Sequence, residues 1–87
     1  MPIVELPSAL RVHADRQARV TVTARTVQEA LEALCVAHPA LRAQLFMATG
    51  LRRTIGIFVN EEDVRDTLSQ ELGPRDVVVL ITAMAGG

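Results

Sequence analysis

The feature that most limits the fold of this chain is a change in hydrophobic period at Thr26. Before this residue, apolar side chains alternate with polar ones, which is typical of half-buried strands. After it, apolar residues recur at i, i+3, i+4, i+7 and i+8, namely Val27, Ala30, Leu31, Leu34 and Cys35. A single long helix must bury such a stripe against one face of a sheet, so the pattern predicts an α+β protein.

Local signals bound this helix on both sides. Thr26 is followed three residues later by Glu29, which is the spacing of a capping box. The helix is expected to end at His38-Pro39, because proline disfavours helical geometry in the residue before it. One or two further helical turns fit the apolar residues Leu41, Leu45 and Phe46.

Four segments have the two-residue period of strands: residues 2–6, 19–23, 55–60 and 77–81. The first two are joined by a short polar segment and predict a hairpin, whereas the helix predicts one parallel crossover between the second and third strands. A small strand or turn is expected around Val64, and residues 47–54 are interpreted as a loop. The prediction is a mixed sheet of four to five strands with one main helix on one face.

The strand alternation also predicts which side chains leave the core. The inward set is Val4, Leu6, Val20, Val22, Ile55, Ile57, Val59, Val78 and Leu80. The opposite phase places Ile3, Phe58, Val79 and Ile81 on the sheet face that the helix does not cover. Large apolar side chains outside the core indicate a partner-docking patch. The alternatives are a loop that covers them or a register shifted by one residue, which would exchange the two faces.

Composition narrows the class of protein. Eighty-seven residues are enough for one core, and 49% hydrophobic residues argue against disorder. The chain has neither an apolar stretch near 18 residues nor the features of a signal peptide, so we expect a soluble, cytoplasmic protein that does not enter membranes. A net charge of −1 and only two aromatic residues argue against nucleic acid as the main partner.

Few residues are candidates for catalysis or for metal binding. The single cysteine, Cys35, lies on the apolar helical stripe and is expected to be a buried core thiol; it excludes an internal disulfide and an iron–sulfur cluster. Cys35 and His38 could share a helix face, but two ligands do not make a metal site. No base paired with a nucleophile can be named, so we expect no catalytic residue, no metal and no bound cofactor. The acidic residues between 61 and 66 predict a solvated turn, or alternatively a surface that steers docking onto basic partners.

The chain ends in Gly86-Gly87, directly after an apolar strand. Glycine is costly to order and has no side chain to pack, so this ending is either idle or serves as a thin, flexible arm for its terminal carboxylate. We therefore expect a domain over residues 1–82 and a flexible tail over residues 83–87. A terminal carboxylate has a reference pKa of about 3.5 and is ionised at neutral pH.

Several of these features together are similar to one family. The β-β-α-β-β order, the segment IFVNEEDVR, a Gly-x-x-Asp turn before the last strand and the terminal AMAGG resemble the MoaD/ThiS family of ubiquitin-like, β-grasp sulfur carriers. The resemblance covers the whole chain. Within the family, LRVHADRQARV and IFVNEEDVR look most like the CysO branch, whose members supply sulfur for cysteine formation. Many members have a proline where this chain has Thr82, and the absence of proline is expected to leave the exit from the last strand more mobile.

The resemblance implies a function for the tail. A ubiquitin-activating-like enzyme would consume ATP to adenylate the Gly87 carboxylate, and a sulfur donor would convert it to a thiocarboxylate. Residues Ala83, Met84, Ala85 and Gly86 would form a slender arm that enters the active sites of partners. The acceptor would be a cysteine-synthase-like enzyme, a thiazole-synthase-like enzyme or the large subunit of molybdopterin synthase.

Other functions remain open at this point. The chain could be the small subunit of molybdopterin synthase, with a lasting interface on its outer face. It could be a ubiquitin-like modifier attached to protein lysines, or an interaction module whose tail is idle. On its own, we expect it to be a monomer.

Overall fold

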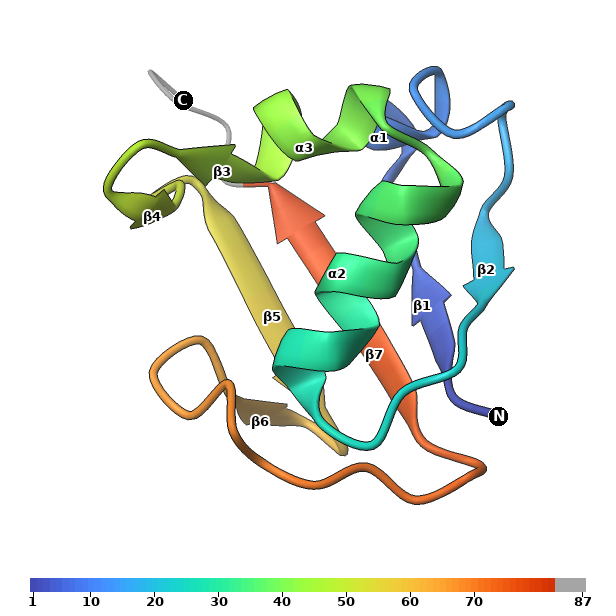
Figure 1. Ribbon diagram of the computed structural model, residues 1–87, viewed down its shortest axis with the longest axis vertical. Coiled ribbons are helices and arrows are strands. Elements are labelled where there is room, and N and C mark those ends of the chain that lie inside the picture. The colour runs from blue at the N-terminus through green and yellow to red at the C-terminus, as the bar shows by residue number, and fades with distance from the viewer. Residues whose placement is uncertain (83–87) are drawn as a thin grey trace.

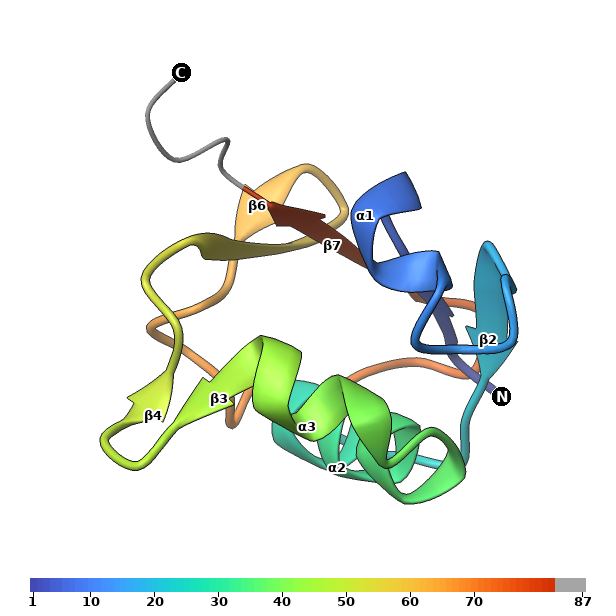
Figure 2. The ribbon, with the colours of Figure 1, turned by 90° about the horizontal axis from the view of Figure 1, so that it is seen from above.

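The computed structural model of the protein describes residues 1–82 (Figure 1). Its elements in chain order are β1 (Ile3–Glu5), α1 (Ser8–Arg11), β2 (Arg19–Thr21), α2 (Val27–Ala37), α3 (Ala40–Leu45), β3 (Phe46–Met47), β4 (Gly50–Leu51), β5 (Ile55–Val59), β6 (Glu62–Asp63) and β7 (Val77–Thr82). Figure 2 shows α2 and α3 together on one side of the main sheet. None of the helices within residues 1–82 is long and apolar enough to cross a membrane.

The main sheet has five strands in the order β2-β1-β7-β5-β6, and the prediction of a mixed sheet is confirmed. Strands β1 and β7 are parallel, whereas the other neighbouring pairs are antiparallel. The predicted crossover differs in detail, because β2 and β5 run in the same direction but are not neighbours. Strand β7 lies between β1 and β5, and its sequence VVVLI is apolar on both faces, as expected of a central strand.

The start of α2 follows the predicted capping pattern with one change. Thr26 Oγ1 accepts a hydrogen bond from the Glu29 amide at 3.1 Å. The Glu29 carboxylate accepts from the Arg25 amide at 2.8 Å, one residue before the cap and not from Thr26 itself. The helix ends at Ala37, immediately before His38-Pro39 as predicted. Helix α3 then ends at Leu45, so the interpretation of Phe46 as helical is wrong; this residue is extended and begins β3.

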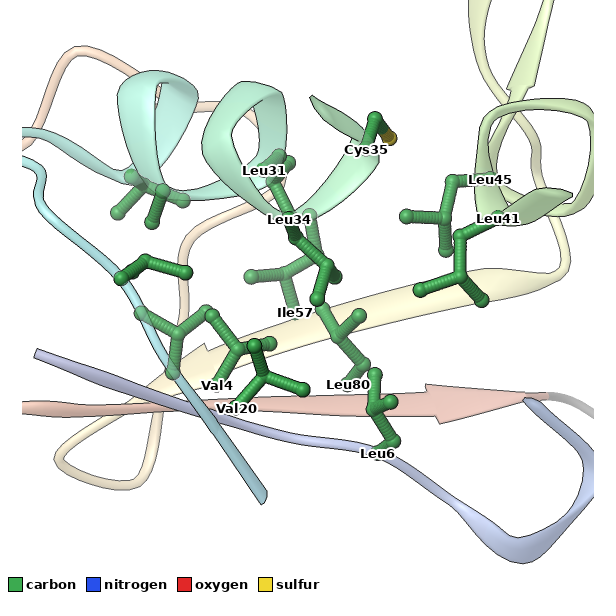
Figure 3. Close-up of a cluster of buried hydrophobic side chains, with 14 of the residues drawn as sticks. Val4, Leu6, Val20, Leu31, Leu34, Cys35, Leu41, Leu45, Ile57 and Leu80 are labelled. Carbon is green, nitrogen blue, oxygen red and sulfur yellow. The ribbon is translucent and has the colours of Figure 1, made fainter. Parts of the chain in front are cut away.

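The core lies between the sheet and the two longer helices (Figure 3). Leu31 and Leu34 of α2 and Leu41 and Leu45 of α3 are fully buried against the inward side chains of the strands. All nine inward residues predicted from the alternation are buried, which confirms the strand phases. Leu10 and Ala14 also belong to the core. They come from α1 and the turn after it, a helical segment that was not predicted.

Two connections differ from the interpretation of the sequence or add to it. Residues 47–54 are not a plain loop, because Phe46 and Leu51 are partners in the β3–β4 hairpin. The Gly-x-x-Asp turn before β7 is closed by Gly73, whose amide donates to the Asp76 carboxylate at 2.8 Å. This bond fixes the direction in which the chain enters the central strand.

Candidate functional site

The candidate site is the surface around Thr82, at the end of β7. Thr82 is the last described residue and pairs with Ile55, the first residue of β5. The predicted reactive residue Gly87 and the predicted arm lie outside the described residues; the arm consists of Ala83, Met84, Ala85 and Gly86. The structure therefore describes the surroundings of Thr82, which is here called the tail root.

The structure places the four residues of the predicted docking patch on one face of the sheet, the outer face. The strand register brings Phe58 opposite Val79 and Ile3 opposite Val77, on the side away from α2. Ile81 is the most open of the four, with 44% of its surface exposed. The others are half-buried against their neighbours. A role in docking stays a prediction for all four.

Charged residues flank this apolar centre. Val79 of β7 pairs with Glu5 of β1, and Phe58 of β5 pairs with Asp63 of β6. A carboxylate therefore lies on each side of the Val79–Phe58 pair across the sheet. Glu5 also forms an ion pair with Arg19 of the edge strand at 2.7 Å. An apolar centre with a polar border is the usual composition of a protein–protein interface.

A basic surface lies beside the tail root. Arg52, Arg53 and Arg65, here called the arginine cluster, line an open hollow with Met47 and Leu51. The guanidinium of Arg65 donates to the carbonyl oxygens of Ile55 at 2.7 Å, Arg53 at 3.1 Å and Arg52 at 3.4 Å. Strand β6 pairs only with Phe58 and Val59, so the Arg65 side chain supplies a hydrogen-bond donor at the start of β5 that β6 does not reach. The same side chain also holds the connection between β4 and β5.

Sequence reasoning assigned no role to the arginine cluster. The available signal was the Arg52-Arg53 pair, which lies one residue before the strand predicted over residues 55–60. The contribution of Arg65 had no local signal, because its partners lie 10 to 13 residues away along the chain.

Cys35 is 2% exposed, so the prediction of a buried core thiol is confirmed. Burial raises the pKa of this thiol; the positive charge of Arg42 opposes the rise, and the negative charge of Glu32 adds to it. The thiol is therefore neutral at physiological pH and a poor nucleophile. His38 lies 3.9 Å from the carboxylate of Asp15. Among residues 1–82, no three His, Cys, Asp or Glu side chains come together as a possible metal site.

This architecture defines the class of protein: it is a ubiquitin-like β-grasp domain, with its first and last strands parallel in the middle of the sheet and α2 across one face. The model of the ThiS family matches residues 4–87. The chain belongs to the ThiS family. None of the curated proteins matches the chain.

Solved structures agree over nearly the whole chain. A chain of the BexX/CysO complex of Amycolatopsis orientalis is 31% identical with a TM-score of 0.88, and the match covers 100% of both chains. CysO of Mycobacterium tuberculosis, which is described as an antigen, is 26% identical with a TM-score of 0.86, over 97% of this chain and 100% of that one. SAMP1 of Haloferax volcanii is 32% identical with a TM-score of 0.81, over 99% and 98%. The chain is thus close to CysO within its family.

Proposed function

We propose that this protein is a sulfur carrier that delivers sulfur from a thiocarboxylate formed at Gly87. The observation that supports this most directly is the match to the ThiS family, which extends through residue 87 and so includes the terminal diglycine. The folded domain is the part that partner enzymes recognise, and the tail is the part on which they act. The chain itself supplies no catalytic group in this proposal.

The chemistry requires activation, because an ionised carboxylate repels nucleophiles and has no usable leaving group. An oxygen of the Gly87 carboxylate attacks the α-phosphorus of ATP, and pyrophosphate leaves. A sulfur donor at the oxidation level of sulfide then attacks the acyl carbon of the adenylate, and AMP leaves. The net change at Gly87 is one oxygen replaced by one sulfur, with no redox step. ATP is used by the activating enzyme, and we place the reaction in the cytoplasm.

The two terminal glycines suit this role. The reacting carbon has to meet fixed groups of a partner at about 3 Å, inside a channel that water does not fill. A side chain at either position would widen the arm and restrict its dihedral angles. Outside the channel, the outer face with Phe58, Val79, Ile81 and Ile3 provides the apolar surface for docking.

The similarity to CysO supports cysteine formation as the destination of the sulfur, with a cysteine-synthase-like enzyme as acceptor. The terminal sulfur attacks an electrophile held in that enzyme, so free sulfide is not released. A thiazole-synthase-like acceptor or the large subunit of molybdopterin synthase would use the same thiocarboxylate. Co-purification with one of these three enzymes distinguishes among them.

A second candidate function is that of a ubiquitin-like protein modifier. The supporting observation is the 32% identity to SAMP1, which is named a small archaeal modifier protein. In that case the activated Gly87 would form an amide with a lysine of another protein. High-mass conjugates that disappear when Gly87 is deleted would favour this function over sulfur transfer.

Intact-protein mass spectrometry tests the primary proposal. The chain is incubated with ATP, a sulfur donor and an activating enzyme that accepts it, and a gain of about 16 Da is expected from the exchange of oxygen for sulfur. Two variants serve as controls: one lacks Gly87, and the other carries one extra C-terminal residue that no protease removes. Both are expected to show no gain. A gain in either control would show that Gly87 is not the site of reaction.

A further inference from the structure

We propose that the arginine cluster is a docking surface for an acidic patch on the activating enzyme. This inference rests on the proposed function, because it concerns the enzyme that adenylates Gly87. It adds the chemical nature of the partner surface and the part of this chain that recognises it. The cluster is distinct from the apolar outer face described above.

The cluster lies at the tail root. Arg53 is two residues before Ile55, and Ile55 pairs with Thr82, the last described residue of β7. The guanidinium of Arg65 is 2.7 Å from the carbonyl oxygen of Ile55. In Figure 1, the connection from β4 to β5 lies near the end of β7. The three arginines therefore lie near the start of β5, which pairs with Thr82 at the end of β7.

The length of the tail places the activating enzyme over this surface. Five residues follow Thr82, and a fully extended chain spans at most about 3.6 Å per residue, or roughly 18 Å in all. An enzyme that holds Gly87 in its active site must therefore approach Thr82 within that distance. Because the cluster adjoins Thr82, it lies in the area that the enzyme covers or borders.

The three arginines form no ion pair within the described part of the chain. The ion pairs within residues 1–82 are Arg19 with Glu5 and His38 with Asp15, so none of the three guanidinium groups has a carboxylate within 4.0 Å there. The side-chain partners found for Arg65 and Arg52 are backbone carbonyls, which leave the positive charge in place. The net charge of the whole chain is −1, so the positive charge of this surface is opposite in sign to that of the chain as a whole.

Glu61 and Glu62 are separated from this surface along β5, whereas Asp63 and Asp66 flank Arg65 in the sequence, and the Asp63 carboxylate accepts from the Arg65 amide at 3.0 Å. The turn with Glu61 and Glu62 follows Val59, and Val59 pairs with Val78 near the start of β7. It therefore lies at the opposite end of β5 from Ile55 and Thr82. An acidic partner surface would be attracted at the tail root and repelled at the far end, which orients the chain with its tail toward the enzyme. Such complementarity acts mainly on association rate and specificity.

The composition of the hollow favours a protein surface over a free anion as the occupant. Met47, which is 51% exposed, and Leu51 lie beside the arginines. Methionine and arginine are both enriched in protein interfaces. A guanidinium held by backbone carbonyls, as Arg65 is, is also ordered before binding and loses less entropy on contact with a carboxylate.

Charge reversal with a matched control tests this inference. Arg53→Glu is the test variant, because the Arg53 side chain is exposed, and Arg75→Glu is the control on an exposed turn near the start of β7. The measurement is ATP–pyrophosphate exchange by the cognate ubiquitin-activating-like enzyme, with the concentration of the chain varied. We expect Arg53→Glu to raise KM for the chain about tenfold with kcat within about twofold, and Arg75→Glu to leave both unchanged. The increase in KM should shrink at high salt, where the Debye length falls to about 3 Å.

Three other results would overturn the inference, and one of them would overturn the proposed function as well. Equal KM values for Arg53→Glu and wild type, or equal increases for both variants, would overturn the inference while leaving the proposed function intact. Absence of exchange with the wild-type chain would overturn the proposed function and the inference with it. Inorganic phosphate that shifts the NMR signals of Arg52 and Arg53 without enzyme, and competes with the enzyme for the chain, would assign the surface to a free anion instead. Thermal unfolding of each variant checks that the fold is retained.

Discussion

The side chain of Ile81 lies directly over Gly56 on the outer face of the sheet. The two residues are partners in the β5–β7 ladder. A Cβ atom at Gly56 would lie 2.6 Å from Cγ1 and 2.9 Å from Cδ1 of Ile81, and 3.6 Å from the ring of Phe58. Because position 56 has no side chain, Ile81 occupies the space over it, next to the tail root.

The variant Gly56→Ala is expected to displace Ile81 from this position. The added methyl group requires the Ile81 side chain to rotate away, at a cost of about 1 kcal/mol in the free energy of unfolding. In a background of Ile81→Ala the same change should be about 1 kcal/mol less harmful, since the atoms that it meets are gone. Urea unfolding of the four proteins measures this coupling. Additive effects would show that the two residues do not contact each other in solution.

The outer face is expected to contribute to recognition by the activating enzyme. The variant Ile81→Asp introduces a charge into the apolar centre, and its desolvation on docking should raise KM for the chain about tenfold or more. The control is Val36→Asp on α2, because Val36 is 76% exposed and lies on the helical side of the sheet. Steady-state kinetics of adenylation compare the two variants. Equal KM values would assign docking to another surface.

Arg65 is expected to contribute to stability through the carbonyl groups that it bonds. The variant Arg65→Gln leaves the edge of β5 at Ile55 without its donor, which should lower the free energy of unfolding by about 2 kcal/mol. Arg75→Gln on an exposed turn is the control and should change it by less than about 0.5 kcal/mol. Hydrogen exchange should also become faster near residues 52–55. A loss no larger than that of the control would contradict the bonding described here.

The buried thiol of Cys35 gives a dependence on pH. Burial raises its pKa in the folded chain above the unfolded value of about 8.5, so the unfolded chain releases the proton first as pH increases. The contribution of this thiol to stability is therefore complete below about pH 8 and is lost as pH rises toward the folded pKa. Urea unfolding between pH 7 and 10 should show a steeper decrease for the wild type than for Cys35→Ala. Parallel decreases would mean that the thiol is not desolvated.

Much of the fold could be predicted because the hydrophobic period is regular. The α2 stripe, its cap at Thr26 and the inward strand residues all follow from local pattern, and each is found as expected. Helix α1 has only four residues, too few for a period to show, and it was missed. The pairing of β1 with β7 is a contact between the two ends of the domain, which no local pattern encodes.

The candidate site also has a part that could be predicted from local sequence pattern and a part that could not. The outer-face positions of Phe58, Val79 and Ile81 follow from alternation along single strands, so they could be predicted. The arginine cluster could not be, because it combines residues before β5 with one after β6 and depends on hydrogen bonds to backbone atoms. The close approach of Ile81 to Gly56 depends on sheet register, which the sequence specifies only through the assembled fold.

The parallel pairing of β1 with β7 also determines when this protein can fold during its synthesis. Among the strands of residues 1–82, β7 is the last to leave the ribosome, yet both β1 and β5 need it as their neighbour in the sheet. The nascent chain therefore cannot close its sheet until residues 77–82 have emerged. Until then β1 and β5 have no strand between them, and the two parts of the sheet cannot join.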